Sequence, residues 1–306
     1  TSWIHKNPSF GYHLIGFVNT EKTNDLLCPV TKLELVLAAY KADEILVGNF
    51  ESRAEILTDI VDVGEESGCR IRIVQETEDV YSRHLDVHQF GPFKVFSVRE
   101  EPLSQTPSKI YKRIFDVVFS MLVLLFIYWW IYAIIWLLVK LSSKDSIFFK
   151  QKRVGRGGQE FYCLKFRTMS MNGSDKEGHG GITKLDDNRI TSLGAFLRKT
   201  NIDELPQFLN VLSGDMSVIG PRPHMIEEDH TVAEKLRKYR IRRFVRPGIS
   251  GWAQVNGFRG GTEDMELMQK RVDYDIDYIE SWTPLLDLKI IWHTILQMLT
   301  LKTGAH

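Results

Sequence analysis

The chain has 306 residues, which is enough for two domains of ordinary size. Its composition, 43% apolar and 25% charged, is that of a globular protein and excludes a disordered chain or a collagen-like repeat. The 39 Lys and Arg residues balance the 39 Asp and Glu residues, and this zero net charge argues against a dedicated nucleic-acid-binding protein. Three separated cysteines with no CxxC pair predict neither a disulfide framework nor a zinc ribbon.

The first hundred residues alternate apolar segments of strand length with segments of helical length. We expect strands at 12–18, 44–47 and 69–74 and helices at 32–41 and 52–66. Such alternation favours a parallel α/β layer. No GxGxxG turn occurs in it, so the sequence predicts a partial Rossmann-like domain over residues 1–104. A docking or regulatory role is favoured there over ligand binding.

One segment is hydrophobic enough to enter a membrane. Residues 117–139 are 23 consecutive residues without a charge, which matches the roughly 20 apolar residues of a membrane-spanning helix. A linker with two prolines, residues 101–108, precedes this segment and is expected to lack regular structure. The basic residues around the linker's end would either bind lipid phosphates or simply flank a helix (Lys109, Lys112 and Arg113). We assign residues 105–144 to the linker and a membrane-inserted helix.

Four polar clusters follow, and each combines Gly, Pro or Asn with charged residues. They occupy residues 148–155 with 165–169, residues 187–198, residues 201–207 with 220–223, and residues 246–254. A separate stretch, residues 235–246, holds seven Lys or Arg and no acidic residue, and would form either a solvated face or a contact with anionic lipid or phosphate. Near the end, residues 278–301 have helical apolar spacing, which fits either a core helix or an interfacial one.

The third cluster contains two adjacent carboxylates, Asp203 and Glu204. One explanation is structural, because Asn201 and Glu204 have the spacing of a capping box. Pro206 favours a chemical role, because a proline at the fifth helical position would remove a hydrogen bond and strain the first turn. The helix N-terminus would keep both carboxylates ionised, as a nucleophile or metal ligand must be. Arginines in the same clusters then indicate a phosphorylated substrate and Mg²⁺ (Arg189, Arg198 and Arg222).

In this order, the four clusters resemble those of the bacterial sugar transferases, the monotopic polyprenyl-phosphate phosphoglycosyl transferases. The similarity extends from Lys112 to about Leu299. The segment before the apolar run resembles the long subclass, and we expect that the chain lacks the upstream membrane helices of that subclass. The resemblance implies a mixed α/β protein with a partial Rossmann-like domain, a membrane-inserted re-entrant helix, and an α-rich membrane-associated catalytic domain over residues 145–306.

The resemblance also implies a reaction. Asp203 would attack the β-phosphorus of a UDP-sugar and expel UMP, while Glu204 would hold the Mg²⁺ that neutralises the diphosphate. Polyprenyl (undecaprenyl) phosphate would then take the sugar-1-phosphate from Asp203, as the first membrane step of exopolysaccharide, capsule or O-antigen synthesis. The alternative is a catalytically inactive, membrane-tethered scaffold of the same pathway. The residues expected to bind substrate are Arg113, Arg153, Lys165, Arg167, Arg189, Arg198, Gln207, Arg222 and Arg246.

The expected location is the bacterial inner membrane, with the catalytic domain facing the cytoplasm. Partners would be the membrane, a UDP-sugar and polyprenyl phosphate, with a homodimer as a further candidate assembly and no nucleic acid. Because basic residues flank both ends of the apolar run, they do not choose a side. The implied catalytic half needs a cytoplasmic nucleotide sugar, and a Rossmann-like domain is normally cytoplasmic too, so both flanks belong on one face. This predicts a bent, re-entrant helix with its turn near residues 129–133, although the run contains neither Pro nor Gly.

Overall fold

The computed structural model describes residues 13–19, 26–29, 32–40, 42–48, 54–75, 86–90, 93–97, 99, 101–142, 146–169, 189–259 and 264–300. The chain divides into two compact units, residues 1–100 and residues 101–306. The second unit contains the apolar run and the four polar clusters. Asp187 and Asn188 of the second cluster lie outside the described residues.

In its described residues, the first unit combines short strands with two helices. Its strands are β1 (Phe17–Asn19), β2 (Leu26–Pro29), β3 (Glu44–Gly48), β4 (Arg70–Gln75), β5 (Asp86–Phe90) and β6 (Phe93–Ser97), and its helices are α2 (Leu33–Ala39) and α3 (Ala54–Ser67). The predictions for β3, β4, α2 and α3 are confirmed to within two residues at each end. In β4, Ile71 and Ile73 are buried while Arg72 between them is not, because successive side chains of a strand point to opposite faces.

The main sheet of this unit is mixed, which corrects the expected parallel layer. β3 and β4 are parallel, but β6 pairs antiparallel with both β4 and β5, in the order β3-β4-β6-β5. Only two residues separate β5 from β6, and so short a connection permits only antiparallel pairing. The predicted strand at 12–18 is displaced as well, because residues 13–16 are not a strand and β1 begins at Phe17.

Two prolines begin helices, which corrects the expected irregular linker at residues 101–108. Pro102 starts the 3₁₀ turn η3 (Pro102–Ser104), and Pro107 lies in the first turn of α4 (Thr106–Val123). Proline suits these positions because the first N–H groups of a helix have no partner within it, and because its fixed φ is already helical.

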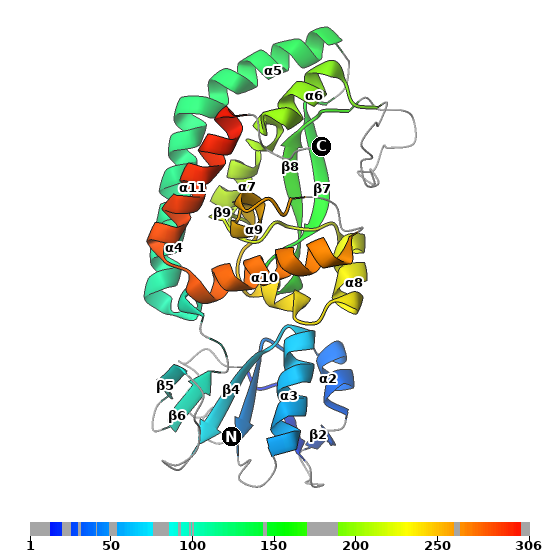
Figure 1. Ribbon diagram of the computed structural model, residues 1–306, viewed down its shortest axis with the longest axis vertical. Coiled ribbons are helices and arrows are strands. Elements are labelled where there is room, and N and C mark those ends of the chain that lie inside the picture. The colour runs from blue at the N-terminus through cyan, green and yellow to red at the C-terminus, as the bar shows by residue number, and fades with distance from the viewer. Residues whose placement is uncertain are drawn as a thin grey trace. The chain divides into compact units, whose positions relative to one another are not determined.

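α4 continues through η4 (Leu124–Tyr128) into α5 (Trp129–Ser142) as one apolar helix. Residues 106–138 are long and apolar enough to cross a membrane, and they form the one such helix in the described part of the chain. η4 is a turn of π-helix, which locally disturbs the hydrogen-bond ladder, and Figure 1 shows the ribbon change direction between α4 and α5. This change of direction begins just before the expected residues 129–133. The apolar run has no proline to disturb the helix, and the π-helical turn η4 is the irregularity found there instead.

The polar side chains of α4 face the protein, and its apolar side chains face outward. Lys112, Asp116 and Ser120 follow one another at four-residue spacing and are all buried. Large apolar residues of α4 and η4 are exposed (Ile110, Tyr111, Ile114, Val118, Met121, Leu122, Leu125, Phe126 and Ile127). A helix in water has the opposite pattern, so this distribution supports lipid as the solvent of α4.

Beyond the apolar helix, the second unit is built around a hairpin and several further helices. Its strands are β7 (Phe148–Val154), β8 (Glu160–Phe166), β9 (Ser217–Ile219) and β10 (Gly248–Ser250), and a 3₁₀ turn, η5 (Arg156–Gly158), joins the first two. Its helices are α6 (Ser192–Lys199), α7 (Gln207–Ser213), α8 (Ile226–Lys235), α9 (Trp252–Val255), α10 (Met265–Ser281) and α11 (Pro284–Leu299), with 3₁₀ turns η6 (Ile202–Glu204) and η7 (Tyr239–Phe244). The core centres on β9, whose residues are all buried. Tyr132 of α5 stacks on Phe148 of the hairpin, with 5.8 Å between ring centroids.

The predicted helix at residues 278–301 is in fact the end of α10 followed by α11. The Thr283 hydroxyl accepts a hydrogen bond from the Leu286 N–H, and Pro284 starts the new helix, so the chain cannot continue α10. α11 contacts α4 through Asp287, which pairs with Lys112 at 2.7 Å. Ile290 is fully buried, while Trp292 is 60% exposed, so α11 has a core face and an exposed apolar face. The core assignment is confirmed for the first face, and an interfacial role of the second stays a prediction.

The basic stretch at residues 235–246 does not form a single helix. It contains the end of α8 and the turn η7, and its charges divide between the interior and the surface. Arg242 is buried and pairs with Asp275, and Arg243 pairs with the buried Asp229. Arg237 and Lys238, in contrast, are exposed.

Candidate active site

Asp203 and Glu204, hereafter the carboxylate pair, lie in η6 between α6 and α7. Asn201 precedes the turn with a left-handed backbone (φ 55°), a conformation that Asn tolerates better than most residues, and its side chain makes no cap hydrogen bond. Pro206 is the residue before α7. The predicted capping box and the strained helical proline are therefore wrong. The carboxylates occupy a separate 3₁₀ turn, and the α-helix begins only after Pro206.

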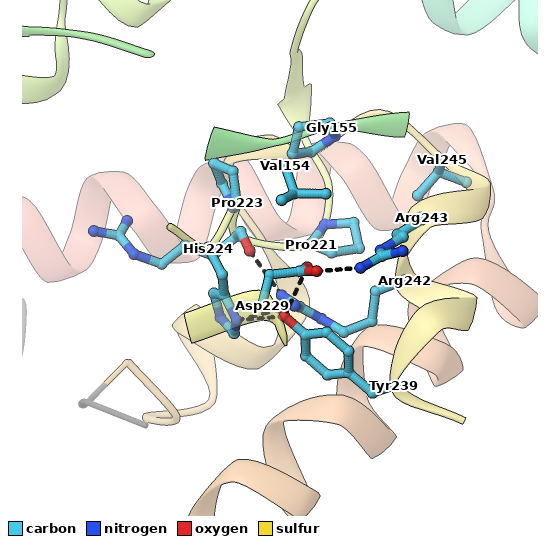
Figure 2. Close-up of a pocket in the computed structure, with 12 residues that line it drawn as sticks. Val154, Gly155, Pro221, Pro223, His224, Asp229, Tyr239, Arg242, Arg243 and Val245 are labelled. Carbon is cyan, nitrogen blue, oxygen red and sulfur yellow. Dashed lines mark hydrogen bonds and ion pairs between the residues drawn. The ribbon is translucent and has the colours of Figure 1, made fainter. Parts of the chain in front are cut away.

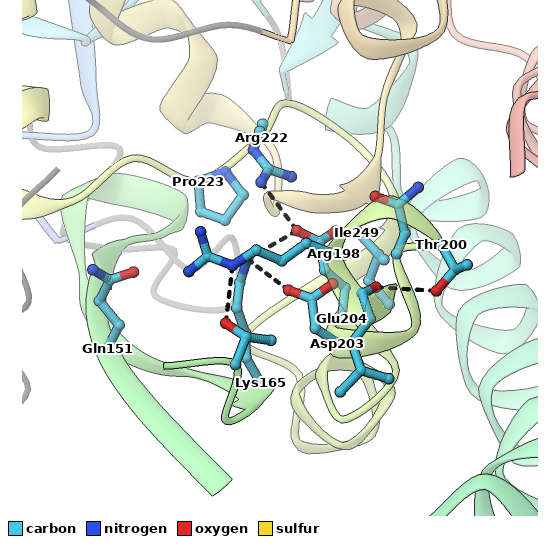
Figure 3. Close-up of polar contacts among 12 residues, drawn as sticks. Gln151, Lys165, Arg198, Thr200, Asp203, Glu204, Arg222, Pro223 and Ile249 are labelled. Atoms are coloured by element: carbon cyan, nitrogen blue, oxygen red, sulfur yellow. Dashed lines mark hydrogen bonds and ion pairs between the residues drawn. The ribbon is translucent and has the colours of Figure 1, made fainter. Parts of the chain in front are cut away.

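Two cations bind one oxygen of Glu204. Its Oε1 atom accepts a hydrogen bond from Lys165 Nζ at 2.9 Å and another from Arg222 at 3.0 Å (Figure 3). Burial alone would raise the pKa of this carboxyl, but Arg222, Lys165 and Arg259 outweigh it and hold the pKa well below its ordinary value. Glu204 is thus a permanent anion at neutral pH.

Asp203 lies in a different environment although it is the adjacent residue. It is only 7% exposed, and its carboxylate oxygens accept no hydrogen bond from the described residues. Lys165 Nζ is the nearest cation, 3.9 Å from Oδ2. Burial, followed by the repulsion of Glu204, raises the pKa of Asp203 from 3.8 to about 6, against the opposing effect of nearby cations. The expectation that a helix N-terminus keeps the pair ionised is therefore wrong: side-chain cations hold Glu204 ionised, while burial opposes the ionisation of Asp203.

Two further arginines surround the carboxylate pair. The backbone of α6 approaches that of Thr168 so closely that a Cβ on Gly194 would lie 1.9 Å from the Thr168 oxygen. This contact lets Arg198 Nε donate to Thr168 Oγ1 at 2.9 Å, within electrostatic range of Asp203. Arg259, which the sequence analysis missed, donates to Asn201 Oδ1 and acts electrostatically on Glu204. It follows the fourth cluster by only five residues, so an extension of that motif would have included it.

The charges of the site do not cancel. Four cations act on the pair, namely Lys165, Arg198, Arg222 and Arg259, and they face two carboxylates. Among the described residues, the cations that act on the pair therefore outnumber its carboxylates by two. Such an excess suits an anionic phosphate group, and arginine is especially suited to phosphate because its planar guanidinium donates two parallel hydrogen bonds.

Two of the arginines predicted to bind substrate lie at the other end of α7. Arg113 of α4 donates to the carbonyl oxygens of Val211 and Leu212 at 2.5 and 2.8 Å. Arg246 Nε donates to the Gly214 oxygen at 2.8 Å. These carbonyl groups lie at the end of α7, where the Gly214 N–H also bonds to the Val211 oxygen, so both arginines add to the cap of its C-terminus.

The other predicted residues fall at varying distances from the pair. Arg153 donates to the Pro223 oxygen, and Arg167 donates to the Ser146 oxygen at the start of the hairpin. Arg189 lies before α6, next to Ile190, which pairs with Met169. Gln207 is buried one helical turn after Asp203, and its amide has no hydrogen-bond partner among the described residues. The structure thus brings Lys165, Arg198 and Arg222 together with the carboxylate pair, and it leaves Gln207 beside it.

A second buried ionic group, hereafter the α4 ion cluster, joins α4 to α10 and α11. It consists of Lys112, Asp116, Tyr278 and Asp287. Lys112 Nζ donates to Asp287 Oδ2 at 2.7 Å and lies 3.6 Å from Asp116 Oδ1, while the Tyr278 hydroxyl donates to Asp287 Oδ1 at 2.8 Å. The cluster therefore holds the polar stripe of α4 against α10 and α11.

Residues 107–301 match the family model described as bacterial sugar transferase. The chain belongs to this family. A UDP-glucose:undecaprenyl-phosphate glucose-1-phosphate transferase of Xanthomonas campestris pv. campestris is 32% identical over 99% of the chain and 64% of its own length. The protein of the same description from Escherichia coli (strain K12) is 32% identical over 95% of the chain and 63% of its own length. The chain thus spans less than two thirds of these two relatives.

A third relative differs in its sugar. A UDP-N-acetylgalactosamine-undecaprenyl-phosphate N-acetylgalactosaminephosphotransferase of Aeromonas hydrophila is 42% identical over 53% of the present chain. The match covers 38% of the length of the Aeromonas protein. Related chains therefore carry different sugars in their descriptions, and family membership alone does not choose among them.

The carboxylate pair of this sugar transferase fits one mode of Mg²⁺ binding. Among the described residues no group of three or more His, Cys, Asp or Glu gathers, so the chain does not form a complete cage there. Mg²⁺ is, however, commonly held by one or two carboxylates together with substrate phosphates. Lys165 and Arg222 both bond to Oε1 of Glu204, and the oxygens of Asp203 accept no hydrogen bond from the described residues. Glu204 Oε2 and one oxygen of Asp203 would then supply the protein ligands.

Proposed function

We propose that this sugar transferase moves a sugar-1-phosphate from a UDP-sugar to undecaprenyl phosphate and releases UMP. The observation that carries the proposal is the contrast within the carboxylate pair. Glu204 accepts hydrogen bonds from two cations, whereas Asp203 is buried with no hydrogen bond to its carboxylate. A carboxylate that has lost its water shell without gaining other donors keeps its lone pairs available for attack.

Asp203 is the nucleophile of the proposed reaction. One of its oxygens attacks the β-phosphorus of the UDP-sugar, the bond from that phosphorus to the bridging oxygen breaks, and UMP departs with the bonding electrons. The product is an acyl phosphate between Asp203 and the sugar phosphate. An oxygen of undecaprenyl phosphate then attacks the same phosphorus, and Asp203 leaves as a carboxylate.

Fixed positive charge assists both displacements. Arg198, Arg222 and Lys165 act electrostatically on Asp203, and in the proposed reaction their charge would offset the negative charge that develops on the phosphoryl oxygens, which is the usual source of catalysis in phosphoryl transfer. Mg²⁺, when bound by Glu204 with Asp203, would neutralise the diphosphate. Because Glu204 stays ionised, it is suited to hold the cation throughout the reaction.

The membrane helix is proposed to bend back to the face it enters. The exposed apolar surface of α4 and the π-helical turn η4 support this topology, which would place both units at the cytoplasmic face of the inner membrane. Cysteines introduced at Thr106 and Ser146 test it in intact cells with a membrane-impermeant thiol reagent. Both should be protected until the membrane is opened. Labelling of one position alone from outside would mean that the helix spans the bilayer.

The decisive experiment traps the intermediate. Detergent-solubilised wild-type chain, incubated with a UDP-sugar labelled at the β-phosphate and without a lipid acceptor, should release UMP and become labelled in a hydroxylamine-sensitive bond. Asp203→Asn should acquire no label, and Asp273→Asn, which alters an exposed carboxylate of α10, should be labelled like wild type. Absence of label and of UMP from every UDP-sugar tried would leave the inactive scaffold as the better explanation.

The same assay identifies the sugar. A panel with UDP-glucose, UDP-galactose and their N-acetylated counterparts compares the rates of UMP release directly. A product that joins undecaprenyl diphosphate to the preferred sugar would start a surface glycan, which is the pathway we propose. A homodimer stays a prediction, and sedimentation of the detergent-solubilised chain would test it.

A further inference from the structure

The loop that carries Arg222 is fixed through its backbone. It connects β9 to α8, and three successive carbonyl oxygens each accept a hydrogen bond from a different part of the protein. Pro221 accepts from the Gly248 N–H at 2.9 Å, Arg222 accepts from Arg242 at 2.7 Å, and Pro223 accepts from Arg153 at 2.5 Å. Because prolines flank Arg222, the φ angle of each neighbour is also restricted. The position of the Arg222 side chain therefore depends on what holds these carbonyl groups.

The middle carbonyl is held by a side chain that is itself held rigidly. Arg242 is 7% exposed, and its Nε donates to Asp275 Oδ2 at 2.7 Å. Asp275 is 1% exposed and belongs to α10, a helix that packs into the core. The Arg242 guanidinium also lies over the Tyr239 ring, 5.1 Å from its centroid. The planar fork of arginine lets one edge bind Asp275 while another nitrogen binds the Arg222 carbonyl.

We infer that Arg242, oriented by Asp275, is a positioning residue that holds Arg222 against Glu204. The contacts run from α10 to the site as Asp275, Arg242, the Arg222 carbonyl and the Arg222 guanidinium, which reaches Glu204 at 3.0 Å. Arg242 does not touch the carboxylate pair in this chain of contacts. This inference rests on the proposed function, since it assigns Arg242 a role in the same site.

A buried ion pair by itself is weak evidence of a role, because desolvation offsets most of its attraction. The neighbouring pair in η7 provides the comparison. Arg243 binds Asp229, which also accepts a hydrogen bond from the Tyr239 hydroxyl, and Figure 2 shows Tyr239 between Asp229 and His224. No hydrogen bond links Arg243 to Arg222 among the described contacts. Each of the two adjacent arginines thus pairs with a buried aspartate, although the Arg243 side chain is 23% exposed and that of Arg242 only 6%, and only Arg242 reaches the backbone of the Arg222 loop.

The test compares these two arginines by UMP release in the full chain. Arg242→Gln should lower kcat/KM about 10- to 100-fold, the usual effect of losing a residue that orients an active-site group. Arg243→Gln, the matched control, should cause a much smaller loss. In addition, the double variant Arg222→Gln/Arg242→Gln should be no slower than Arg222→Gln alone, because Arg242 acts only through Arg222. A purely structural effect of Arg242 would instead multiply with the loss from Arg222→Gln.

A second variant keeps the test valid if Arg242→Gln misfolds. Arg242→Gln/Asp275→Asn removes both charges of the pair, so no unpaired charge stays buried, and its melting temperature checks the fold. It should still lose activity about 10- to 100-fold, because the Arg222 carbonyl has lost its donor. Wild-type activity in the folded Arg242→Gln/Asp275→Asn variant would overturn the positioning role. So would losses that multiply in Arg222→Gln/Arg242→Gln. Neither result would overturn the proposed function. An inactive wild type would overturn the proposed function and the inference together.

Discussion

The carboxylate pair and the α4 ion cluster are two buried groups that each place two carboxylates beside a lysine. The contrast between them lies in Asp287 and Asp203, because Asp116, the other carboxylate of the α4 ion cluster, accepts hydrogen bonds on Oδ1 but none on its buried Oδ2. In the α4 ion cluster, Asp287 accepts from Lys112 and Trp282 through Oδ2 and from Tyr278 through Oδ1. In the carboxylate pair, Glu204 is bonded to two cations, but Asp203 accepts no hydrogen bond among the described residues.

The difference separates structure from chemistry. A buried carboxylate costs free energy unless hydrogen bonds replace the water it has lost. Asp287 has such replacement on both oxygens, so its charge stabilises the position of α4 and offers nothing to a substrate. Asp203 lacks it, and a group kept in that condition is expected where a reaction will use it. Between Asp203 and Asp287, hydrogen bonding to the carboxylate, more than burial or charge, therefore separates the proposed nucleophile from the residue that anchors α4.

The largest expected effect comes from Asp203→Asn. Because the amide is a poor nucleophile, UMP release should fall at least about 10³-fold, as for other nucleophile replacements. The melting temperature should not fall, since the variant removes a buried charge that few donors stabilise. Activity is measured by UMP release and stability by thermal melting in detergent. A variant that is destabilised as well as inactive would contradict the contrast with Asp287.

Asp287→Ala should have the reverse effect and destabilise the fold. It leaves Lys112 charged and buried without its closest partner, and breaking one side of such a pair costs about 3–5 kcal/mol. The matched control is Asp277→Asn, which removes an exposed carboxylate that accepts from the Trp252 ring N–H at 2.9 Å. Denaturant unfolding of both variants measures the difference. A cost for Asp287→Ala no larger than that for the control would show that the α4 ion cluster is dispensable.

The pH dependence of activity should report Asp203. Its pKa in the folded chain is raised to about 6, mainly by burial, so the nucleophile is protonated at lower pH. We expect kcat/KM to fall about tenfold per pH unit below pH 6 and to level off above it. Stability should change in the opposite sense. Between pH 3.8 and about 6 the folded chain binds the proton more tightly than the unfolded chain, so wild type should lose stability relative to Asp203→Asn as pH rises through that window.

Both measurements have outcomes that count against this assignment. An acid limb centred near pH 4, in a profile of kcat/KM for UMP release, would mean that Asp203 has an ordinary pKa. A stability difference that does not change between pH 4 and pH 6 would mean that Asp203 does not titrate in that range.

Sequence patterns predicted most of the elements and the centre of the site. The period of two in β4 and the long apolar run depend on local chemistry, so they could be found without the fold. The motif order identified Asp203 and Glu204 together with Lys165, Arg198 and Arg222. The predictions that rested on prolines were wrong. Pro102 and Pro107 begin helices instead of an irregular linker, and Pro206 separates a 3₁₀ turn from α7 instead of straining a helix.

The roles of individual charged residues could not be predicted from spacing. Arg113 and Arg246 belong to conspicuous motifs, yet both bond to the carbonyl groups that end α7. Whether an arginine meets a substrate or a helix end depends on which element faces it, and that is decided by packing between distant segments. The split within the carboxylate pair has the same origin, because Lys165 comes from β8 and Arg222 from the loop after β9.

The smallest expected effect concerns charges that are not buried at all. Lys152 and Glu160 form an ion pair across the β7–β8 hairpin at 3.3 Å, and their side chains are 53% and 51% exposed. Water already solvates both groups, so Glu160→Gln should change the free energy of unfolding by less than about 1 kcal/mol and leave UMP release unchanged. Because salt screens an exposed pair, even this difference should shrink as ionic strength rises. A loss as large as that of Asp287→Ala would mean that the hairpin depends on charge in a way that exposure does not reveal, and burial could no longer explain why the α4 ion cluster matters.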